Sequence, residues 1–198
     1  MNDFKSAALL AGGNSKRMGF DKQFFHIFKE RLFENIIPTL KKRFEDVIVV
    51  TELPELYHDM NIRTVSDIIP DFGPLSGIHA AVTESKSKYV FILACDMPNI
   101  NIDYIDFMIE NIKRNTADAC VTNKGDWIEP FHAFYGKTGL PVIEADLLEN
   151  KGTILHYLQK VNTLYIPESD ARLFTPDWSL FFNINTPEEY NETSAKTY

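Results

Sequence analysis

Cysteine is scarce in this chain, which has two among its 198 residues. Cys95 and Cys120 lie in apolar stretches and lack the CxxC spacing of zinc and redox sites. We therefore expect buried, reduced thiols and a cytoplasmic protein rather than a disulfide-stabilised one. The five histidines lack metal-ligand spacing as well, so we interpret them as structural, with His132 as the first candidate for another role.

Basic residues are also in short supply. Lys and Arg total 20 against 28 Asp and Glu, which gives a net charge of −8. A general nucleic-acid-binding surface is not expected, because it needs many Lys and Arg side chains to neutralise phosphates. Long apolar runs are missing too. The run near the N-terminus stops at Gly12 after a few residues, which is too short for a signal peptide or a membrane span.

The chain does contain short apolar runs that alternate with longer helical patterns, which is typical of an α/β fold with a largely parallel sheet. Val47–Val50 and Tyr89–Leu93 are apolar throughout, as expected of strands covered on both faces. The predicted strands are Ser6–Leu10, Val47–Thr51, Arg63–Val65, Tyr89–Ala94, Ala117–Thr122, Phe131–Tyr135, Asn162–Ile166 and Phe181–Ile184. Because no repeat or linker interrupts the pattern, we expect one domain over residues 1–198.

Apolar residues at helical spacing predict three amphipathic helices. The apolar positions are Leu32, Ile36, Leu40 and Phe44, then Ile102, Ile105, Ile109 and Ile112, then Leu140, Ile143 and Leu147. Pro38 lies inside the first pattern and should kink or break that helix. Thr186-Pro187-Glu188-Glu189 predicts a further helix start with a capping box.

The most informative segment directly follows the first predicted strand. Gly12 and Gly13 let backbone N–H groups approach an anion, and Lys16, Arg17 and Lys22 add positive charge nearby. The pattern is neither GxGxxG nor GxxxxGK[ST], and a tight strand-to-helix turn is the alternative interpretation. A locally basic, glycine-turned loop in an acidic chain nevertheless favours a nucleotide-phosphate site.

Polar residues also follow other predicted strands, at the sheet edge where ligands bind in open α/β folds. Asp96 ends the apolar run Tyr89–Cys95 and suits Mg²⁺, although a cap for the following turn is the alternative. Asn183 and Asn185 alternate along the last predicted strand and would share one face. They would orient a polar substrate or, alternatively, bond locally before Thr186.

Another candidate segment has glycines around a predicted helix start. Gly73 and Gly77 permit close approach of backbone or ligand, and Pro74 fits the first helical position. Asp67, a few residues earlier, has the acceptors for the N1–H and exocyclic amine of guanine. A structural loop with an exposed aspartate is the alternative, and the residues alone leave the two interpretations open.

Together these segments resemble the molybdenum cofactor guanylyltransferases, the MobA family, over nearly the full length. The motifs that carry the resemblance are Leu10-Ala11-Gly12-Gly13, Arg17-Met18-Gly19, Asp21-Lys22, Gly73-Pro74-Leu75-Ser76-Gly77, Cys95-Asp96-Met97-Pro98, Glu129-Pro130-Phe131 and Phe182-Asn183-Ile184-Asn185-Thr186-Pro187-Glu188-Glu189. The first signature is shared by a wider nucleotidyltransferase superfamily. The closing Asn-x-Asn-Thr-Pro-Glu-Glu favours MobA-like proteins.

The resemblance implies a Rossmann-like three-layer α/β/α sandwich, similar to the nucleotide-diphospho-sugar transferases. It also implies that the protein uses Mg²⁺ and transfers GMP from GTP to molybdopterin. The implied protein partners are apo-molybdoenzymes or other cofactor-biosynthesis proteins. By this similarity the nucleotide-binding residues are Leu10, Ala11, Gly12, Gly13, Lys22, Thr51, Asp67, Gly73 and Asp96. Lys22, Arg17 and Asp96 would be catalytic, with Asp67 reading guanine and Asp96 carrying the metal ion.

The acceptor side is expected among aromatic and amide side chains, which suit a planar, polar pterin. The candidates are Trp127, Glu129, Phe131, His132, Asn183 and Asn185. Thr51 stands where family members often have an Asn that touches the nucleotide, whereas the Gly-Gly pair favours guanine over cytosine. A CTP-dependent enzyme, a sugar-phosphate acceptor and a non-catalytic cofactor-handover protein are the competing hypotheses.

Overall fold

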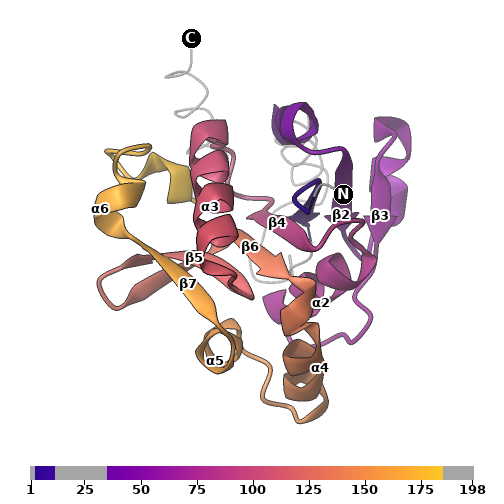
Figure 1. Cartoon of the computed structure of the whole chain (residues 1–198). Coiled ribbons are helices and arrows are strands. Elements are labelled where there is room, and N and C mark those ends of the chain that lie inside the picture. Colours follow the sequence, from indigo (N-terminus) through magenta and orange to yellow (C-terminus); the bar gives the residue numbers. More distant parts are fainter. Residues whose placement is uncertain (1–2, 12–34, 185–198) are drawn as a thin grey trace.

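A computed structural model describes residues 3–11 and 35–184, and the strands in these ranges form one seven-stranded sheet (Figure 1). The strands are β1 (Ser6–Leu10), β2 (Asp46–Val50), β3 (Arg63–Val65), β4 (Tyr89–Ala94), β5 (Ala119–Lys124), β6 (Trp127–Gly136) and β7 (Thr163–Pro167). Their order is β3-β2-β1-β4-β6-β5-β7. Neighbouring strands are parallel except at β6, which is antiparallel to β4 and β5. The predicted α/β fold with a mostly parallel sheet is confirmed.

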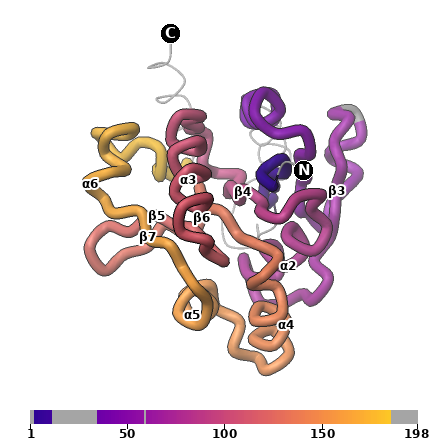
Figure 2. Tube along the Cα trace, in the orientation of Figure 1, coloured from indigo at the N-terminus to yellow at the C-terminus, as the bar shows by residue number. Residues whose placement is uncertain are grey.

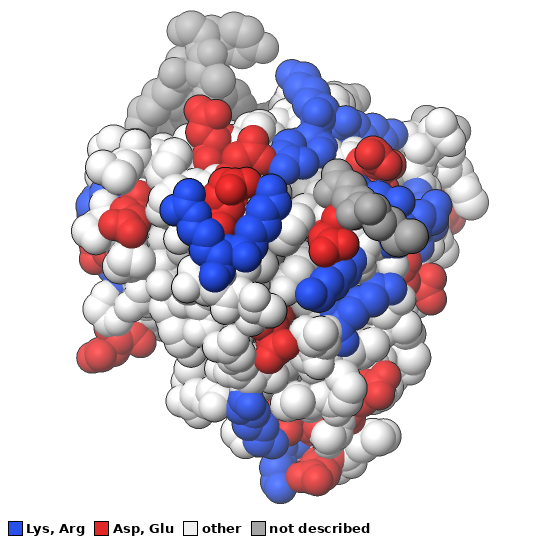
Figure 3. All heavy atoms as spheres, in the orientation of Figure 1, with Lys and Arg blue, Asp and Glu red and all other residues white. Residues whose placement is uncertain are grey.

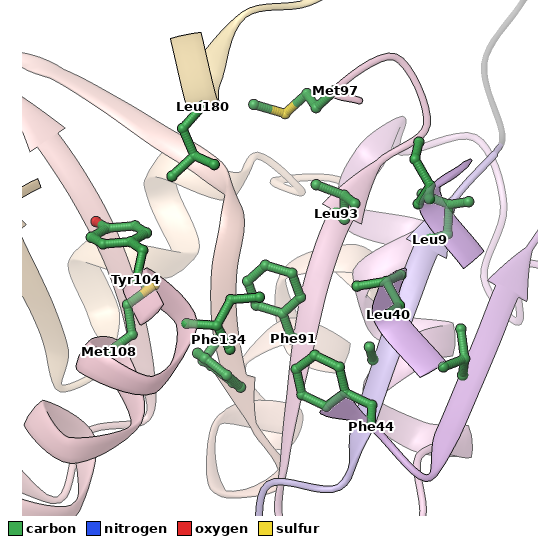
Figure 4. Packing of buried hydrophobic residues seen from close by; sticks show 14 of the residues in the cluster. Leu9, Leu40, Phe44, Phe91, Leu93, Met97, Tyr104, Met108, Phe134 and Leu180 are labelled. Atoms are coloured by element: carbon green, nitrogen blue, oxygen red, sulfur yellow. The ribbon is translucent and has the colours of Figure 1, made fainter. Parts of the chain in front are cut away.

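The central strands are buried on both faces, which is why they are apolar without a break. In β1, Ala7 and Leu9 belong to one core, whereas Ala8 and Leu10 belong to the other. The two-residue period of a strand therefore divides each strand between two cores. In the first core, Phe44 stacks on Phe91 with ring centroids 5.6 Å apart, as the close view in Figure 4 shows.

Helices cover both faces of the sheet and complete three layers (Figures 1 and 2). They are α2 (Pro74–Glu84), α3 (Ile102–Asn115), α4 (Leu140–Leu148), α5 (Ile154–Lys160) and α6 (Glu168–Ala171), with 3₁₀ turns η2 (Pro54–Met60), η3 (Lys137–Gly139) and η4 (Ser179–Phe181). The helix over residues 35–43 and α3 pack on the first core, and α2, α4 and α5 pack on the second. Among the described residues, every helix is too short or too polar to cross a bilayer.

Two local predictions are wrong. The segment predicted as a strand over Phe181–Ile184 ends η4 and continues without regular structure. It crosses the loop after β4, where the backbone N of Ile184 donates to the carbonyl of Asp96 at 2.7 Å. Of the kink or break predicted at Pro38, the break is wrong, since residues 35–43 are helical throughout. A proline removes one backbone hydrogen bond, and burial of the apolar face of this helix outweighs that loss.

Charged side chains of both signs are mixed on the surface. On the face shown in Figure 3, Lys and Arg side chains lie among Asp and Glu side chains. Two surface ion pairs join Arg43 to Asp106 at 2.6 Å and Lys113 to Glu110 at 2.7 Å. Exposed pairs of this kind contribute little stability each, so the apolar cores supply most of it.

A buried carboxylate ties the amino ends of β1 and β2 together. Asp46 is 7% exposed and accepts hydrogen bonds from Ser6 Oγ at 2.8 Å, Arg63 NH2 at 2.8 Å and the backbone N of Lys86 at 3.1 Å. Burial acts to raise the pKa of Asp46, but these donors outweigh it and hold the pKa below its usual value of 3.8. The ionised carboxylate therefore stabilises the fold, at the sheet edge opposite the carboxyl ends of the parallel strands.

We expect Asp46→Ala to lower the free energy of unfolding by about 2–3 kcal/mol at pH 7, because several buried donors lose their acceptor. Part of this deficit should disappear as the pH falls below 4, because the Asp46 carboxyl of the unfolded chain then binds a proton before that of the folded protein does, which reduces the stabilisation in the wild type. Urea denaturation of both proteins at pH 7 and pH 3.5 measures the effect. Asp106→Ala is the control, with an expected loss below about 1 kcal/mol. Equal losses in the two variants would contradict the stabilising role of Asp46.

Candidate nucleotide cleft

A cleft of about 440 Å³ opens at the carboxyl ends of β1, β2 and β4. Its lining residues are Leu10, Val50, Thr51, Glu52, Asp67, Asp71, Gly73, Pro74, Gly77, Ala94, Cys95, Asp96, Phe131 and Asn183. The chain passes from β1 to β2 and β3 on one side and returns to β4 on the other side of β1. Strand order thus reverses beside β1, which is where ligands bind in open α/β sheets.

Backbone hydrogen bonds beyond the strand ends fix the floor of this cleft. The N–H of Ala11 donates to the carbonyl of Val50 at 2.9 Å, and the N–H of Cys95 donates to the carbonyl of Leu10 at 3.1 Å. The first residues after β1 and β4 are therefore still hydrogen-bonded to the neighbouring strand. The side chain of Asp96, one residue further along, starts from a fixed backbone position.

Glycine brings the start of α2 close to the cleft floor. A Cβ on Gly77 would lie 3.3 Å from Leu10 Cδ2 and 3.7 Å from Val50 Cγ1, so a side chain here would crowd these residues. Gly73 precedes the helix with φ +58°, a left-handed conformation that glycine adopts without steric cost. Pro74 occupies the first turn, so this helix start is confirmed.

One end of the cleft is acidic, with Glu52, Asp67 and Asp71 in its lining. Oε1 of Glu52 accepts a hydrogen bond from the backbone N of Asp67 at 3.1 Å. Burial of the Asp67 carboxyl and, secondarily, the negative charge of Glu52 raise its pKa from 3.8 to about 6. Asp67 is therefore ionised at neutral pH, but its ionisation reduces the stability of the folded protein. A shifted pKa of this kind is common for carboxylates in functional sites.

Thr51 lies in the cleft lining, but its hydroxyl has a local partner. The side chain is 4% exposed, and Oγ1 accepts a hydrogen bond from the backbone N of Leu53 at 3.0 Å. This bond forms the turn that leads from β2 into η2. The exposed polar side chain at the end of β2 is therefore that of Glu52.

Asp96 lies in the turn after β4 and is half-buried in the cleft lining. The helix that follows, α3, is capped by Asn101, whose side chain accepts from the backbone N of Tyr104 at 3.0 Å. Asn101, and not Asp96, is therefore the cap of α3. Asp96 instead shares the cleft with the acidic end formed by Glu52, Asp67 and Asp71.

The predicted acceptor-side residues separate into two groups. Asn183 and Phe131 line the cleft, whereas Glu129 lies outside the lining, with Oε1 accepting from Nε1 of Trp178 at 3.2 Å. Burial raises the pKa of Glu129 above its usual value. His132 is fully enclosed and does not line the cleft.

The ring of His132 packs in the first core. It lies edge-on between Phe91 and Phe181, with centroids 5.5 and 6.0 Å away, and the backbone φ of His132 within β6 is +55°. Burial lowers the pKa of His132 to about 3, so the imidazole is neutral. Phe134, two residues further along β6, belongs to the same core, whereas Phe131 lines the cleft.

The protein ligands available for a metal ion are few. Within residues 3–11 and 35–184, no group of three or more His, Cys, Asp or Glu side chains is arranged to hold a metal ion. The carboxylates in the cleft lining are oxygen donors, the ligand type of hard cations such as Mg²⁺, which take one or two carboxylates and complete their shell with phosphate oxygens and water.

Several predicted residues lie outside the described part of the chain. They are Gly12, Gly13, Arg17, Lys22 and Asn185, together with the predicted helix start at Thr186. Their roles stay predictions. Of the remaining implied nucleotide residues, Leu10, Thr51, Asp67, Gly73 and Asp96 all line one cleft, whereas Ala11 lies just behind it with 5% exposure.

Sequence reasoning missed two acidic residues in the cleft lining, Glu52 and Asp71. The signal for Glu52 was present, because it follows a buried strand almost directly, as Asp96 does. Asp71 had no comparable signal. It lies in an irregular loop with φ +74°, a conformation that only the folded loop reveals.

Comparison with known proteins places this cleft in a family. The family model of the MobA-like NTP transferase domain matches residues 7–161. A relative from Peptoclostridium acidaminophilum named "probable molybdenum cofactor guanylyltransferase" is 48% identical over 98% of this chain and 90% of its own length. A relative from Syntrophotalea carbinolica named "molybdenum cofactor guanylyltransferase" is 45% identical over 96% of this chain and 90% of its own.

Solved structures share the fold at lower sequence identity. The molybdopterin-guanine dinucleotide biosynthesis protein A of Archaeoglobus fulgidus superposes with a TM-score of 0.78 at 24% identity, covering 96% of this chain and 99% of that one. A 2-C-methyl-D-erythritol 4-phosphate cytidylyltransferase of Thermus thermophilus gives 0.63 at 10% identity, covering 98% of each chain. The Rossmann-like α/β fold of nucleotidyltransferases is thereby confirmed.

The raised pKa of Asp67 predicts that Asp67→Asn is more heat-stable than the wild type at pH 8. The folded state binds a proton at Asp67 more tightly than the unfolded chain, so ionisation above pH 6 opposes folding, and the amide removes that cost. At pH 4 the folded carboxyl is already neutral, and the two melting temperatures should nearly coincide. Calorimetry at both pH values checks this. A lower melting temperature for the variant at pH 8 would contradict the raised pKa.

Proposed function

Because the chain belongs to the MobA-like NTP transferase family, we propose that it transfers GMP from GTP to molybdopterin and releases pyrophosphate. The names of the Peptoclostridium and Syntrophotalea relatives support this choice of substrates. The observation that carries the proposal is the convergence of Leu10, Asp67 and Asp96 on one cleft at the reversal of strand order. These residues come from three separate segments of the sequence.

The reaction needs no nucleophilic side chain. A phosphate monoester, such as the terminal phosphate of molybdopterin, is largely dianionic at neutral pH. One of its oxygens forms a bond to the α-phosphorus of GTP, while the bond to the bridging oxygen breaks and pyrophosphate leaves. The protein's task is to hold two anionic groups in line and to offset their charge.

The residues of the cleft divide this task. Asp67, at the acidic end, accepts hydrogen bonds from the guanine N1–H and exocyclic amine. Asp96 holds Mg²⁺, which supplies charge neutralisation at the phosphates. Lys22 and Arg17, which follow Gly12 and Gly13 in the sequence, contribute positive charge.

The acceptor binds on the side of Asn183 and Phe131, with Glu129 beside them. An amide and an aromatic face suit the polar, planar ring of a pterin. Cys95 and Cys120 are not joined in a disulfide, which supports the cytoplasm as the compartment of the reaction. Proteins of cofactor biosynthesis or apo-molybdoenzymes are the proposed partners for delivery and release.

Asp96→Asn should reduce GMP transfer by at least about a hundredfold, because the metal ion loses its carboxylate and the developing charge loses its counterion. The melting temperature and circular dichroism should stay close to the wild type, since Asp96 is in a half-buried turn. Asp126→Asn, in the exposed turn between β5 and β6, is the matched control. A near-normal rate in Asp96→Asn would remove the metal-binding role from this residue.

Nucleotide choice is tested with purified protein, Mg²⁺ and each triphosphate in turn. Pyrophosphate should be released from GTP in the presence of molybdopterin, and at least about tenfold more slowly from CTP. Turnover of CTP but not GTP would support a cytidylyltransferase instead. Pyrophosphate release with a sugar phosphate as acceptor would indicate a sugar-nucleotide-forming enzyme. Tight GTP binding without any pyrophosphate would indicate a non-catalytic cofactor-handover protein.

A further inference from the structure

Glu52 is a cleft residue to which the proposed function assigns no role. It lies two residues after β2, its side chain is exposed, and it lines the cleft. Its Oε1 accepts the hydrogen bond from the backbone N of Asp67, which is fifteen residues further along the chain. An exposed carboxylate that accepts from one backbone N–H at the end of the neighbouring strand is suited to fixing the position of that segment.

This bond is the last of three that join the end of β2 to the segment after β3. The N–H of Thr51 donates to the carbonyl of Val65 at 2.8 Å, and Oγ of Ser66 donates to the carbonyl of Thr51 at 3.0 Å. The third bond, from the N–H of Asp67 to Glu52 at 3.1 Å, holds the residue whose carboxylate faces the cleft. The direction of the Asp67 side chain therefore depends on Glu52.

We infer that Glu52 is a positioning residue, which holds Asp67 so that both of its carboxylate oxygens face the base of the bound nucleotide. The inference rests on the proposed function, in which Asp67 accepts from two adjacent N–H groups of guanine. Two parallel hydrogen bonds from neighbouring donors require a carboxylate in a fixed plane. A base with one of the two donors, such as hypoxanthine, gains less from that arrangement.

Charge in the cleft supports the same assignment. Glu52, Asp67 and Asp71 place negative charge at one end of the cleft, where it attracts N–H donors and repels phosphate. A nucleotide is thus favoured with its base at this end and its phosphates toward Asp96. Glu52 raises the pKa of Asp67 as well, which agrees with the closeness of the two carboxylates.

Two substitutions at Glu52 separate the hydrogen bond from the charge. Glu52→Ala removes both, whereas Glu52→Gln keeps a carbonyl oxygen that accepts from Asp67 N–H and removes only the charge. Glu55→Ala is the matched control, since Glu55 is equally exposed in η2 and is absent from the cleft lining among the described residues. The measurements are kcat and KM for GTP and for ITP, whose base lacks the exocyclic amine, and hydrogen exchange of the Asp67 amide without nucleotide.

Glu52→Ala should raise KM for GTP roughly three- to tenfold, change kcat less, and shrink the preference for GTP over ITP. The Asp67 amide should exchange faster. Glu52→Gln should keep the preference and the slow exchange, while the pKa of Asp67 moves down toward 3.8. Unchanged exchange and an unchanged GTP/ITP ratio in Glu52→Ala, relative to Glu55→Ala, would overturn the inference.

Failure of the proposed function gives a different result. A wild-type protein that does not prefer GTP over ITP or CTP contradicts guanine recognition, and the base-reading role of Glu52 then fails with it. The Asp67 exchange rates still decide, in that case, whether Glu52 holds the segment after β3. A wild-type preference for GTP that Glu52→Ala retains in full contradicts the positioning role alone.

Discussion

The pairing of β1 with β2 on one side and β4 on the other is the constraint on which the rest of the structure depends. Successive strands are added on one side of β1 until β3, and the chain then crosses to the other side. The strands that follow β2 and β4 along the chain lie on opposite sides of β1, so a hollow forms at the carboxyl end of β1. Hydrogen bonds from Ala11 and Cys95 continue the pairing beyond the strands and make that hollow rigid.

The cleft is assembled at a cost in stability that the rest of the fold offsets. Asp67 is a partly buried carboxyl beside Glu52, and ionising it is unfavourable. Asp71, a non-glycine residue, adopts a left-handed backbone conformation in the loop that follows. Strain and unfavourable charge of this kind persist where the surroundings determine the backbone strongly, and they concentrate at functional sites. The Asp46 hydrogen bonds lie at the opposite edge of the sheet, where they stabilise the strands without touching the cleft.

Sequence reasoning worked where a residue's role is local. Unbroken apolar runs identified the buried strands, and the rule that ligands bind at carboxyl strand ends identified Asp96 as a cleft residue. Predictions from the sequence failed where contacts between distant segments determine the position of a residue. The polar–apolar alternation around Asn183 resembles a strand, but that segment crosses the loop after β4 and joins none of the seven strands of the described sheet. The two-residue period places His132 on the face of β6 that carries Phe134, but the sequence does not show that Phe181, from the far end of the described chain, also packs against this ring.

The reversed direction of β6 has a consequence for how such an enzyme diversifies. Because β6 runs opposite to β4, its first residues arrive at the same sheet edge as the carboxyl ends of the parallel strands. Phe131, which lines the cleft, thus belongs to the hairpin of β5 and β6. The turn of this hairpin, at Gly125 and Asp126, lies outside the cleft lining. Lengthening or rebuilding that hairpin alters one half of the cleft alone. Under the proposed assignment, in which the acceptor binds beside Phe131, such a change would alter the choice of acceptor and leave the proposed nucleotide half of the cleft unchanged.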